Sequence, residues 1–251
     1  MKIYRGRINE IIFEFTPPQK SSQGVIIICD GLPSVPNRKE LMTILADKGF
    51  VVVFPRYKGT WESDGEFLKE SPVKDIEEIL QVIKTGKIVE LYANKKIKLP
   101  NCPIHLLGSS FGASIALALA GNKNIAKTVA LSAIVDFKKH NEANNEEDLI
   151  WVGEFIKRAF GQGYRFNDKG WIEMVEGNIF NPPQNINQET ANNILMGYGK
   201  LDYQVNYKKI EQYILDNKIK NVMAEPNAGH LTFSKLHPKA WDKIIKWLLK
   251  I

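Results

Sequence analysis

Residues 104–114 read Ile-His-Leu-Leu-Gly-Ser-Ser-Phe-Gly-Ala-Ser. The apolar run ends abruptly at Gly108, and a run of small, helix-forming residues extends from Ala113 to Ala120. This order predicts a strand, a sharp turn at Ser110 and then a helix. Glycines stand two residues before and two residues after Ser110, where a side chain would collide with neighbouring backbone. The turn therefore presents the Ser110 hydroxyl near the N-terminus of a helix.

A serine in such a strained turn is accessible to a substrate, and the pattern is that of a nucleophile elbow. The five residues from 108 to 112 are a weak signal alone, because glycine and serine are common. The alternative interpretation is a small-residue turn that simply packs a helix on a sheet. The strand before the turn and the helix after it favour the catalytic interpretation.

The composition is that of a soluble globular protein. The chain has 251 residues, 44% hydrophobic and 25% charged, which is enough for one large α/β domain with a buried core. The net charge of +6 comes from scattered lysines with no long basic tract, so nucleic-acid binding is not expected. Cys29 and Cys102, the two cysteines, make no disulfide framework, which suits a reducing compartment.

The sequence also argues against a membrane protein. Its first residues lack the apolar core of a signal peptide, and no stretch is long enough to span a bilayer. We therefore expect a cytoplasmic protein with no membrane association. The sequence makes no prediction of oligomeric state.

Short apolar runs alternate with helical patterns along the chain. Residues 1–15 predict one or two antiparallel edge strands, and further strands are predicted at 25–29, 50–54, 104–109, 126–135, 193–199 and 220–224. Helices are predicted at about 38–48, from 72 onward, at 113–120, 206–215 and 238–249. Continuous apolar strands alternating with helices predict a mostly parallel sheet covered by helices on both faces, an α/β fold.

Residues 137–190 break this rhythm. About fifty residues between two core strands is far longer than a connection needs, and their apolar positions have helical spacing. We interpret residues 137–190 as a helical cap inserted into a core made of residues 1–136 and 191–251. The aromatic side chains of the cap either line a substrate pocket or attach the cap to the core; they are Trp151, Phe155, Phe160, Tyr164, Phe166, Trp171 and Phe180.

Chemistry in parallel sheets collects in the loops at the carboxyl ends of the strands. Four features stand at such ends: Ser110, Asp202, His230 and the loop that begins at residue 30. A serine hydroxyl needs a base to take its proton. His230 is the preferred base, because it follows a strand in a glycine-flanked loop and comes after the serine in sequence.

The other three histidines have simpler explanations. His105 lies inside the strand before the elbow and is expected to be buried, His140 is in the polar start of the cap, and His237 precedes a helix and is expected to be exposed. A base also needs a carboxylate to hold its tautomer. Asp202 is the preferred acid because it ends the preceding strand, and Asp136 is the alternative.

The reacting carbonyl needs hydrogen-bond donors for its developing negative charge. The residue after the nucleophile supplies one backbone N–H, that of Phe111, and the loop after the first buried strand supplies the other, for which Leu32 is the preferred residue. No metal-ligand cluster or glycine-rich phosphate loop stands out in the sequence, so no cofactor is expected.

The chain resembles the α/β-hydrolase superfamily over nearly its full length. Residues 108–112 match the elbow of that family, residues 199–202 its acid turn, and Gly229-His230 its base loop. Residues 59–67 resemble a segment of cinnamoyl-esterase-like and acyl-peptidase-like members. The resemblance implies an eight-stranded, mostly parallel sheet with a cap after the sixth strand. One departure is Asp30, which precedes Gly31 where many members have histidine, and which places a negative charge near the oxyanion.

These residues predict a serine hydrolase, carboxylesterase-like, that cleaves small-molecule esters through an acyl-enzyme at Ser110. A peptidase or a thioesterase would use the same three side chains, and a non-catalytic binding protein on this fold is a further alternative. Dehalogenase and epoxide hydrolase chemistry is disfavoured, because members with those activities have aspartate at the position of Ser110.

Overall fold

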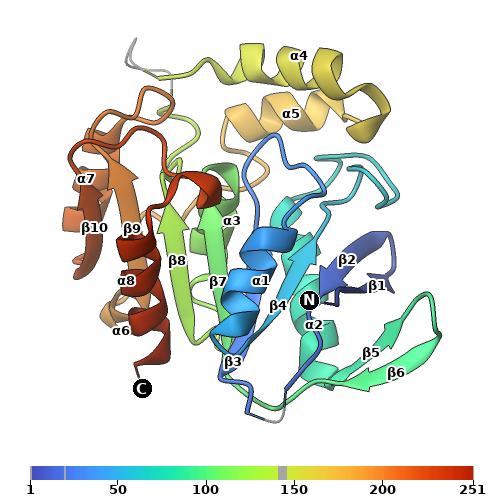
Figure 1. Cartoon of the computed structure of the whole chain (residues 1–251). Helices are drawn as coiled ribbons and strands as arrows, with labels where there is room; N and C mark the ends of the chain where they lie inside the picture. The colour runs from blue at the N-terminus through green and yellow to red at the C-terminus, as the bar shows by residue number, and fades with distance from the viewer. Residues whose placement is uncertain (1, 20, 141–145, 251) are drawn as a thin grey trace.

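An eight-stranded sheet forms the centre of the molecule (Figure 1). The computed structural model describes residues 2–19, 21–140 and 146–250. In sheet order the strands are β1 (Tyr4–Ile8), β2 (Ile11–Phe15), β4 (Phe50–Pro55), β3 (Gly24–Cys29), β7 (Ile104–Ser109), β8 (Lys127–Leu131), β9 (Ile194–Gly199) and β10 (Asn221–Glu225). The β1–β2 and β2–β4 pairs are antiparallel, and the other pairs are parallel. The predicted sheet is confirmed.

The apolar runs predicted as strands are buried on both faces. Every residue of β3 and β4 is buried, as expected for central strands of a parallel sheet. Successive side chains point to opposite faces: Val25 and Ile27 pack into one apolar cluster, and Ile26 and Ile28 into the other.

Helices cover both faces of the sheet. Their bounds are α1 (Lys39–Asp47), α2 (Pro72–Thr85), α3 (Phe111–Leu119), α7 (Tyr207–Asp216) and α8 (Pro238–Leu249). α1 and α8 share one apolar cluster, and α2, α3 and α7 contribute to the other. α2 begins as the sequence predicts: Ser71 accepts a hydrogen bond from the N–H of Val73, and Pro72 is the first helical residue.

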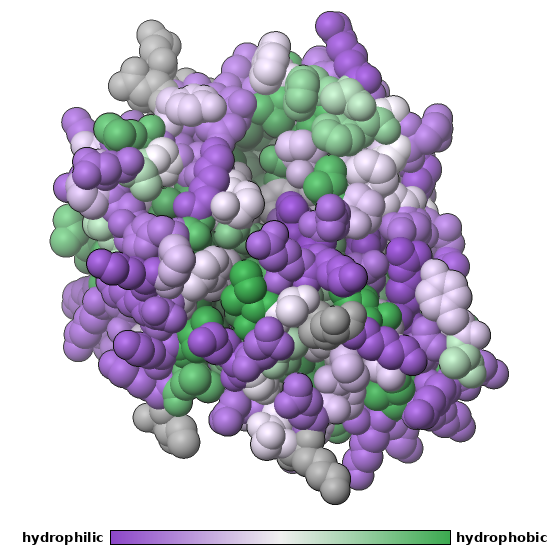
Figure 2. All heavy atoms as spheres, viewed as in Figure 1, coloured by the Kyte–Doolittle hydropathy of each residue, from purple (hydrophilic) through white to green (hydrophobic). Residues whose placement is uncertain are grey.

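Among the described residues between β8 and β9 there are three helices. They are α4 (Leu149–Phe160), α5 (Asp168–Val175) and α6 (Gln188–Asn192), with a 3-10 turn η1 (Gly161–Gly163) after α4. α4 and α5 lie beyond the carboxyl ends of the central strands (Figure 1). Much of Figure 2 is hydrophilic, and hydrophobic residues gather on its upper part, over α4. There Ile150, Trp151 and Phe155 are exposed.

This segment is tied to the loop after β4 by backbone pairing. Thr60 forms an antiparallel bridge with Tyr164, and Phe67 a parallel bridge with Phe166. The guanidinium of Arg165 donates hydrogen bonds to four backbone carbonyls, those of Trp61, Ser63, Gly65 and Gln162. Because most of these bonds run between segments about a hundred residues apart, they fix the position of one on the other.

The sequence analysis did not predict a second sheet. It is a hairpin of β5 (Lys87–Glu90) and β6 (Lys95–Lys98), a separate sheet that contacts β1 and α2 and is seen at the lower right of Figure 1. Its strands are short and rich in lysine, and Ile88 and Ile97 are its inward-facing hydrophobic residues. The structure adds α6 and a 3-10 turn η2 (Phe233–Lys235). No helix within the described ranges is long and apolar enough to cross a bilayer.

Candidate active site

Ser110 lies in the turn between β7 and α3, with backbone angles φ +54° and ψ −127°. A positive φ is strained for a serine, and the N–H of Ser110 donates to the carbonyl of Leu131 at 2.8 Å, which holds the turn in place. The two flanking glycines are required. A Cβ on Gly108 would lie 2.5 Å from the carbonyl oxygen of Gly112, and a Cβ on Gly112 would lie 2.1 Å from that of Cys29.

His230 and Asp202 form a buried pair. His230 follows β10 and Asp202 follows β9, so both lie at the carboxyl end of the sheet. Nδ1 of His230 is 2.8 Å from Oδ2 of Asp202, and because a carboxylate only accepts, Nδ1 carries the proton. Asp202 Oδ1 accepts the N–H groups of Gln204 and Val205 at 2.9 and 3.1 Å.

The Asp202 carboxyl is held in its charged form. Burial alone would raise its pKa, but the hydrogen bond and charge of His230 and two backbone N–H groups outweigh burial and lower it. Since Asp202 occupies Nδ1, the other ring nitrogen of His230, Nε2, is the one left to accept a proton. The alternative acid, Asp136, binds the N–H of Lys138 and the side chain of Asn181 instead.

Ser110 and His230 line one cavity of about 110 Å³. The remainder of its wall is mostly polar and includes Asp30, Arg38, Gln204, Thr232 and Ser234. Ser110 also borders a second cavity, of about 40 Å³, on the side of the segment between β8 and β9. The wall of that cavity is mostly apolar and includes Phe137, Leu149, Val152, Trp171 and Met174.

Several backbone N–H groups beside Ser110 have no partner within the part of the chain that the structure describes. Among them are those of Leu32 and Phe111, which both line the second cavity with Ser110. Phe111 is the first residue of α3, where N–H groups lack a helical acceptor. The structure therefore brings together all five residues that the sequence analysis singled out.

Aromatic side chains fix the loop that contains Leu32. The hydroxyl of Tyr57 donates to the carbonyl of Asp30 at 2.9 Å, and the indole of Trp61 donates to that of Ser34 at 2.7 Å. The hydroxyl of Tyr164, from the segment between β8 and β9, accepts the N–H of Ser34 at 2.6 Å. These contacts hold the loop against both the sheet and the inserted segment.

Asp30 forms an ion pair with Arg38, which balances the negative charge that the sequence places near the oxyanion. Its carboxylate accepts the N–H of Gly31 and the hydroxyl of Ser34, and Nε and Nη2 of Arg38 lie 2.9 and 2.7 Å from Oδ2. Burial raises the pKa of Asp30, and the Arg38 guanidinium and the Ser34 hydroxyl limit the rise. Sequence reasoning missed Arg38. The available signal was Asp30 itself, because a buried carboxylate needs a cationic partner.

The remaining histidines lie outside this pair. His105 is buried in β7 against Phe50, as predicted, and His237 caps the start of α8 with a half-exposed side chain. His140 is buried, and its Nδ1 lies 3.2 Å from Glu146. Of the aromatic residues predicted either to line a pocket or to attach the cap, Trp171 borders the small cavity, whereas Trp151 and Phe155 are exposed.

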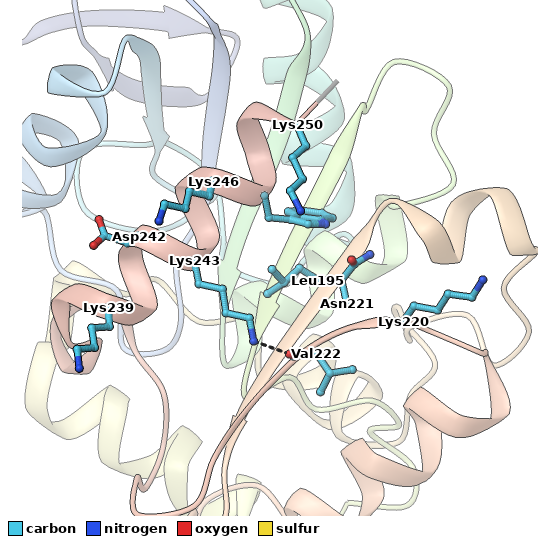
Figure 3. A pocket seen from close by; sticks show the side chains of 10 residues that line it. Leu195, Lys220, Asn221, Val222, Lys239, Asp242, Lys243, Lys246 and Lys250 are labelled. Atoms are coloured by element: carbon cyan, nitrogen blue, oxygen red, sulfur yellow. Dashed lines mark hydrogen bonds between the residues drawn. The ribbon is translucent and has the colours of Figure 1, made fainter.

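A larger cavity, of about 590 Å³, lies near the first residues of β9 and β10 and beside α8, and it contains none of the site residues (Figure 3). Lys220 and Lys239 extend away from each other at its two ends, and Lys243 donates to the carbonyl of Val222 at 2.8 Å. Lys243 belongs to α8, and its bond to a carbonyl of the edge strand β10 helps to cover that edge. No group of three or more His, Cys, Asp or Glu among the described residues is placed to hold a metal ion.

Comparison with solved structures identifies the fold. The Pyrococcus furiosus esterase Pf2001 matches with a TM-score of 0.63 and 15% identity over 98% of this chain and 89% of its own. The α/β hydrolase GrgF from Penicillium sp. sh18 matches with a TM-score of 0.66 and 15% identity, and the match covers 95% of this chain and 93% of GrgF. The acylaminoacyl peptidase of Pyrococcus horikoshii matches with a TM-score of 0.62 and 15% identity, and the match covers 99% of this chain but only 40% of the peptidase.

No family model matches the sequence, and no curated protein matches it either. The sheet order and these structural matches show that the chain has the α/β-hydrolase fold. At these identities the likeness establishes the fold, and the chemistry has to be argued from the site.

Proposed function

We propose that this protein is a serine hydrolase that cleaves carboxylic esters, with Ser110 as nucleophile, His230 as base and Asp202 as its orienting acid. The observation that carries the proposal is the shared cavity of Ser110 and His230, with Nδ1 of His230 held by Asp202 at 2.8 Å. This arrangement supplies the nucleophile, base and orienting group that acyl transfer needs.

The reaction proceeds in two halves. His230 takes the hydroxyl proton at Nε2 while Ser110 Oγ bonds to the ester carbon, and the carbonyl electron pair moves onto oxygen. The N–H groups of Leu32 and Phe111 stabilise that oxyanion. Its collapse breaks the bond to the alcohol, which takes the proton from His230. A water then repeats these steps on the acyl-enzyme and releases the acid.

The inserted segment acts as a cap in this proposal, with the core formed by residues 1–136 and 191–251 and the cap by residues 137–190. Support comes from α4 and α5, which lie beyond the carboxyl ends of the strands in Figure 1. Their residues Val152, Trp171 and Met174 border the small cavity beside Ser110. A substrate bound at Ser110 would therefore contact both parts of the chain.

Fluorophosphonate labelling together with hydrolysis of short nitrophenyl esters tests the proposal. We expect labelling and turnover in the wild type, and loss of both in Ser110→Ala, with turnover falling by roughly 10⁴-fold or more. Ser22→Ala, which changes a serine in a surface loop, is the matched control and should behave as the wild type. Folded wild-type protein that neither labels nor turns over any ester would overturn the proposal in favour of a non-catalytic binding protein.

A further inference from the structure

We infer that the two cavities at Ser110 divide the substrate, and that the enzyme selects short apolar acyl groups esterified to oxygen-rich alcohols. The inference rests on the proposed function. It assigns the cavity of about 40 Å³ to the acyl chain and the cavity of about 110 Å³ to the alcohol. Neither assignment follows from the fold, because substrate pockets differ widely among proteins that share one fold.

The position of His230 indicates which cavity holds the alcohol and which holds the acyl chain. In the first half of the reaction the alcohol oxygen must take a proton from this histidine, so the alcohol leaves on the side of His230. His230 lines the 110 Å³ cavity and is absent from the wall of the other. Phe111, whose N–H group would bind the carbonyl oxygen, lines only the 40 Å³ cavity, and Leu32, the second donor, lies on the wall of both cavities. The acyl chain, which stays on Ser110, therefore extends into the smaller space.

The acyl cavity is small and mostly apolar, with His140, Glu147 and Gln204 as the polar residues of its wall. Its volume of about 40 Å³ is well under half of the 110 Å³ on the side of His230, so the acyl side of Ser110 is the more confined of the two. That space suits acetyl to butyryl chains. Met174 is 1% exposed and Trp171 is 3% exposed, with the indole of Trp171 bound to the carbonyl of Leu149 at 3.1 Å, so packing closes the far end.

The alcohol cavity is polar. Arg38, Thr232 and Ser234 line this cavity and not the other. Arg38 uses Nε and Nη2 on Asp30, which leaves further N–H groups of its guanidinium. An alkyl alcohol would take water from these groups without replacing its hydrogen bonds, whereas a hydroxylated or carboxylate-bearing alcohol would replace them. The chemistry favours oxygen acceptors on the leaving group.

Chain length tests the acyl assignment. Hydrolysis of nitrophenyl acetate, butyrate, hexanoate and octanoate should give kcat/KM values that fall by about 10-fold or more between butyrate and hexanoate, since one methylene in an apolar pocket is worth about 10- to 200-fold. Met174→Ala should raise kcat/KM for hexanoate by about 10-fold relative to butyrate. Val152→Ala, at a half-buried position of α4, gives a second enlargement if Met174→Ala does not fold.

Ile172→Ala is the matched control, because Ile172 belongs to the same helix as Met174 but is 44% exposed and does not line the cavity. It should leave the chain-length profile unchanged. The alcohol assignment is tested with butyrate esters of butanol, glycerol and glycolate, followed by proton release. We expect glycerol or glycolate to exceed butanol by about 10-fold in kcat/KM. Preference between these two esters separates a hydroxylated from an anionic alcohol.

The outcomes distinguish failure of the pocket assignments from failure of the proposed function on which they rest. Absence of labelling and of all turnover overturns the proposed function. Turnover with a flat profile or an optimum at octanoate overturns the acyl assignment, as does a profile that neither enlarging variant shifts. Equal or better hydrolysis of butyl butyrate overturns the alcohol assignment.

Discussion

The guanidinium of Arg38 closes on the buried carboxylate of Asp30, with Nη2 at 2.7 Å and Nε at 2.9 Å from Oδ2. Asp30 begins the loop that positions the N–H of Leu32, and it borders the same cavity as Ser110. An unpaired negative charge there would oppose the oxyanion that we propose to form at Leu32 and Phe111. Arg38 therefore acts as a positioning residue that also cancels this charge.

Replacement of Arg38 alone should lower stability and activity more than replacement of Arg38 and Asp30 together. We expect Arg38→Met to lower the free energy of unfolding by about 3 kcal/mol, the usual cost of leaving a buried charge unpaired, and to lower kcat by about 10-fold. The double variant Asp30→Asn, Arg38→Met should recover part of both losses, because the asparagine side chain carries no charge. Urea unfolding and ester hydrolysis of the wild type, Arg38→Met and the double variant measure these effects. A double variant no better than Arg38→Met would contradict this account, and Lys246→Met, at an exposed lysine of the larger cavity, is the control.

Gly112 is the position in the elbow that tolerates substitution least. A Cβ there would lie 2.1 Å from the carbonyl oxygen of Cys29 and 2.4 Å from that of Asp30, so β3 and α3 would have to separate. We expect Gly112→Ala to lower the free energy of unfolding by at least about 3 kcal/mol, the upper range for overpacking, and to reduce labelling of Ser110. Gly121→Ala is the matched control, since its nearest neighbour would be Thr190 Oγ1 at 4.0 Å. Equal unfolding curves for the two variants would contradict the close-approach argument.

The sequence predicted the sheet and the residues at its carboxyl edge because both depend on strong local patterns. Runs such as 25–29 are apolar throughout, and Ser110 stands between two glycines that the turn requires. Several features escaped prediction, among them a hairpin and an ion pair. The hairpin of β5 and β6 has too few apolar residues to show an alternating pattern, and the pairing of Arg38 with Asp30 depends on how α1 packs beside the loop. The cavities depend in the same way on tertiary packing, which a local pattern does not specify.

Arg165 should hold the loop after β4 against the inserted segment. Its guanidinium donates to four backbone carbonyls, three of them in residues 61–65. At about 0.5–1.5 kcal/mol for each net hydrogen bond, we expect Arg165→Met to lower the free energy of unfolding by about 2 kcal/mol. Hydrogen exchange should rise in residues 59–67 and 161–167 while β3 and β7 stay protected. Arg158→Met, at an exposed position of α4, should change neither measurement, and a uniform rise over the whole chain would refute a local clamp.

His105 should make the fold sensitive to mild acid. Burial in β7, with a further contribution from Lys127, lowers its pKa to about 4 from 6.5. Between these values His105 binds more protons in the unfolded chain than in the folded one, so its contribution to the free energy of unfolding falls as pH falls from about 6.5 to about 4. At pH 4.5 the loss is on the order of 2–3 kcal/mol, at about 1.36 kcal/mol for each pH unit. His105→Leu removes the titrating group. Between pH 7.5 and pH 4.5 the free energy of unfolding of this variant should therefore fall by that much less than the free energy of unfolding of the wild type.

Urea unfolding at the two pH values measures this difference, whatever the variant's stability at pH 7.5. Two carboxyls with shifted pKa values are common to both proteins and cancel in the comparison. The pKa of Glu146 is lowered to about 2 from 4.5, and burial raises the pKa of Asp75 to about 7 from 3.8, which adds stability as pH falls. An equal change for wild type and His105→Leu would place the acid sensitivity elsewhere in the fold, whereas a smaller loss of stability in the variant would identify His105 as its source.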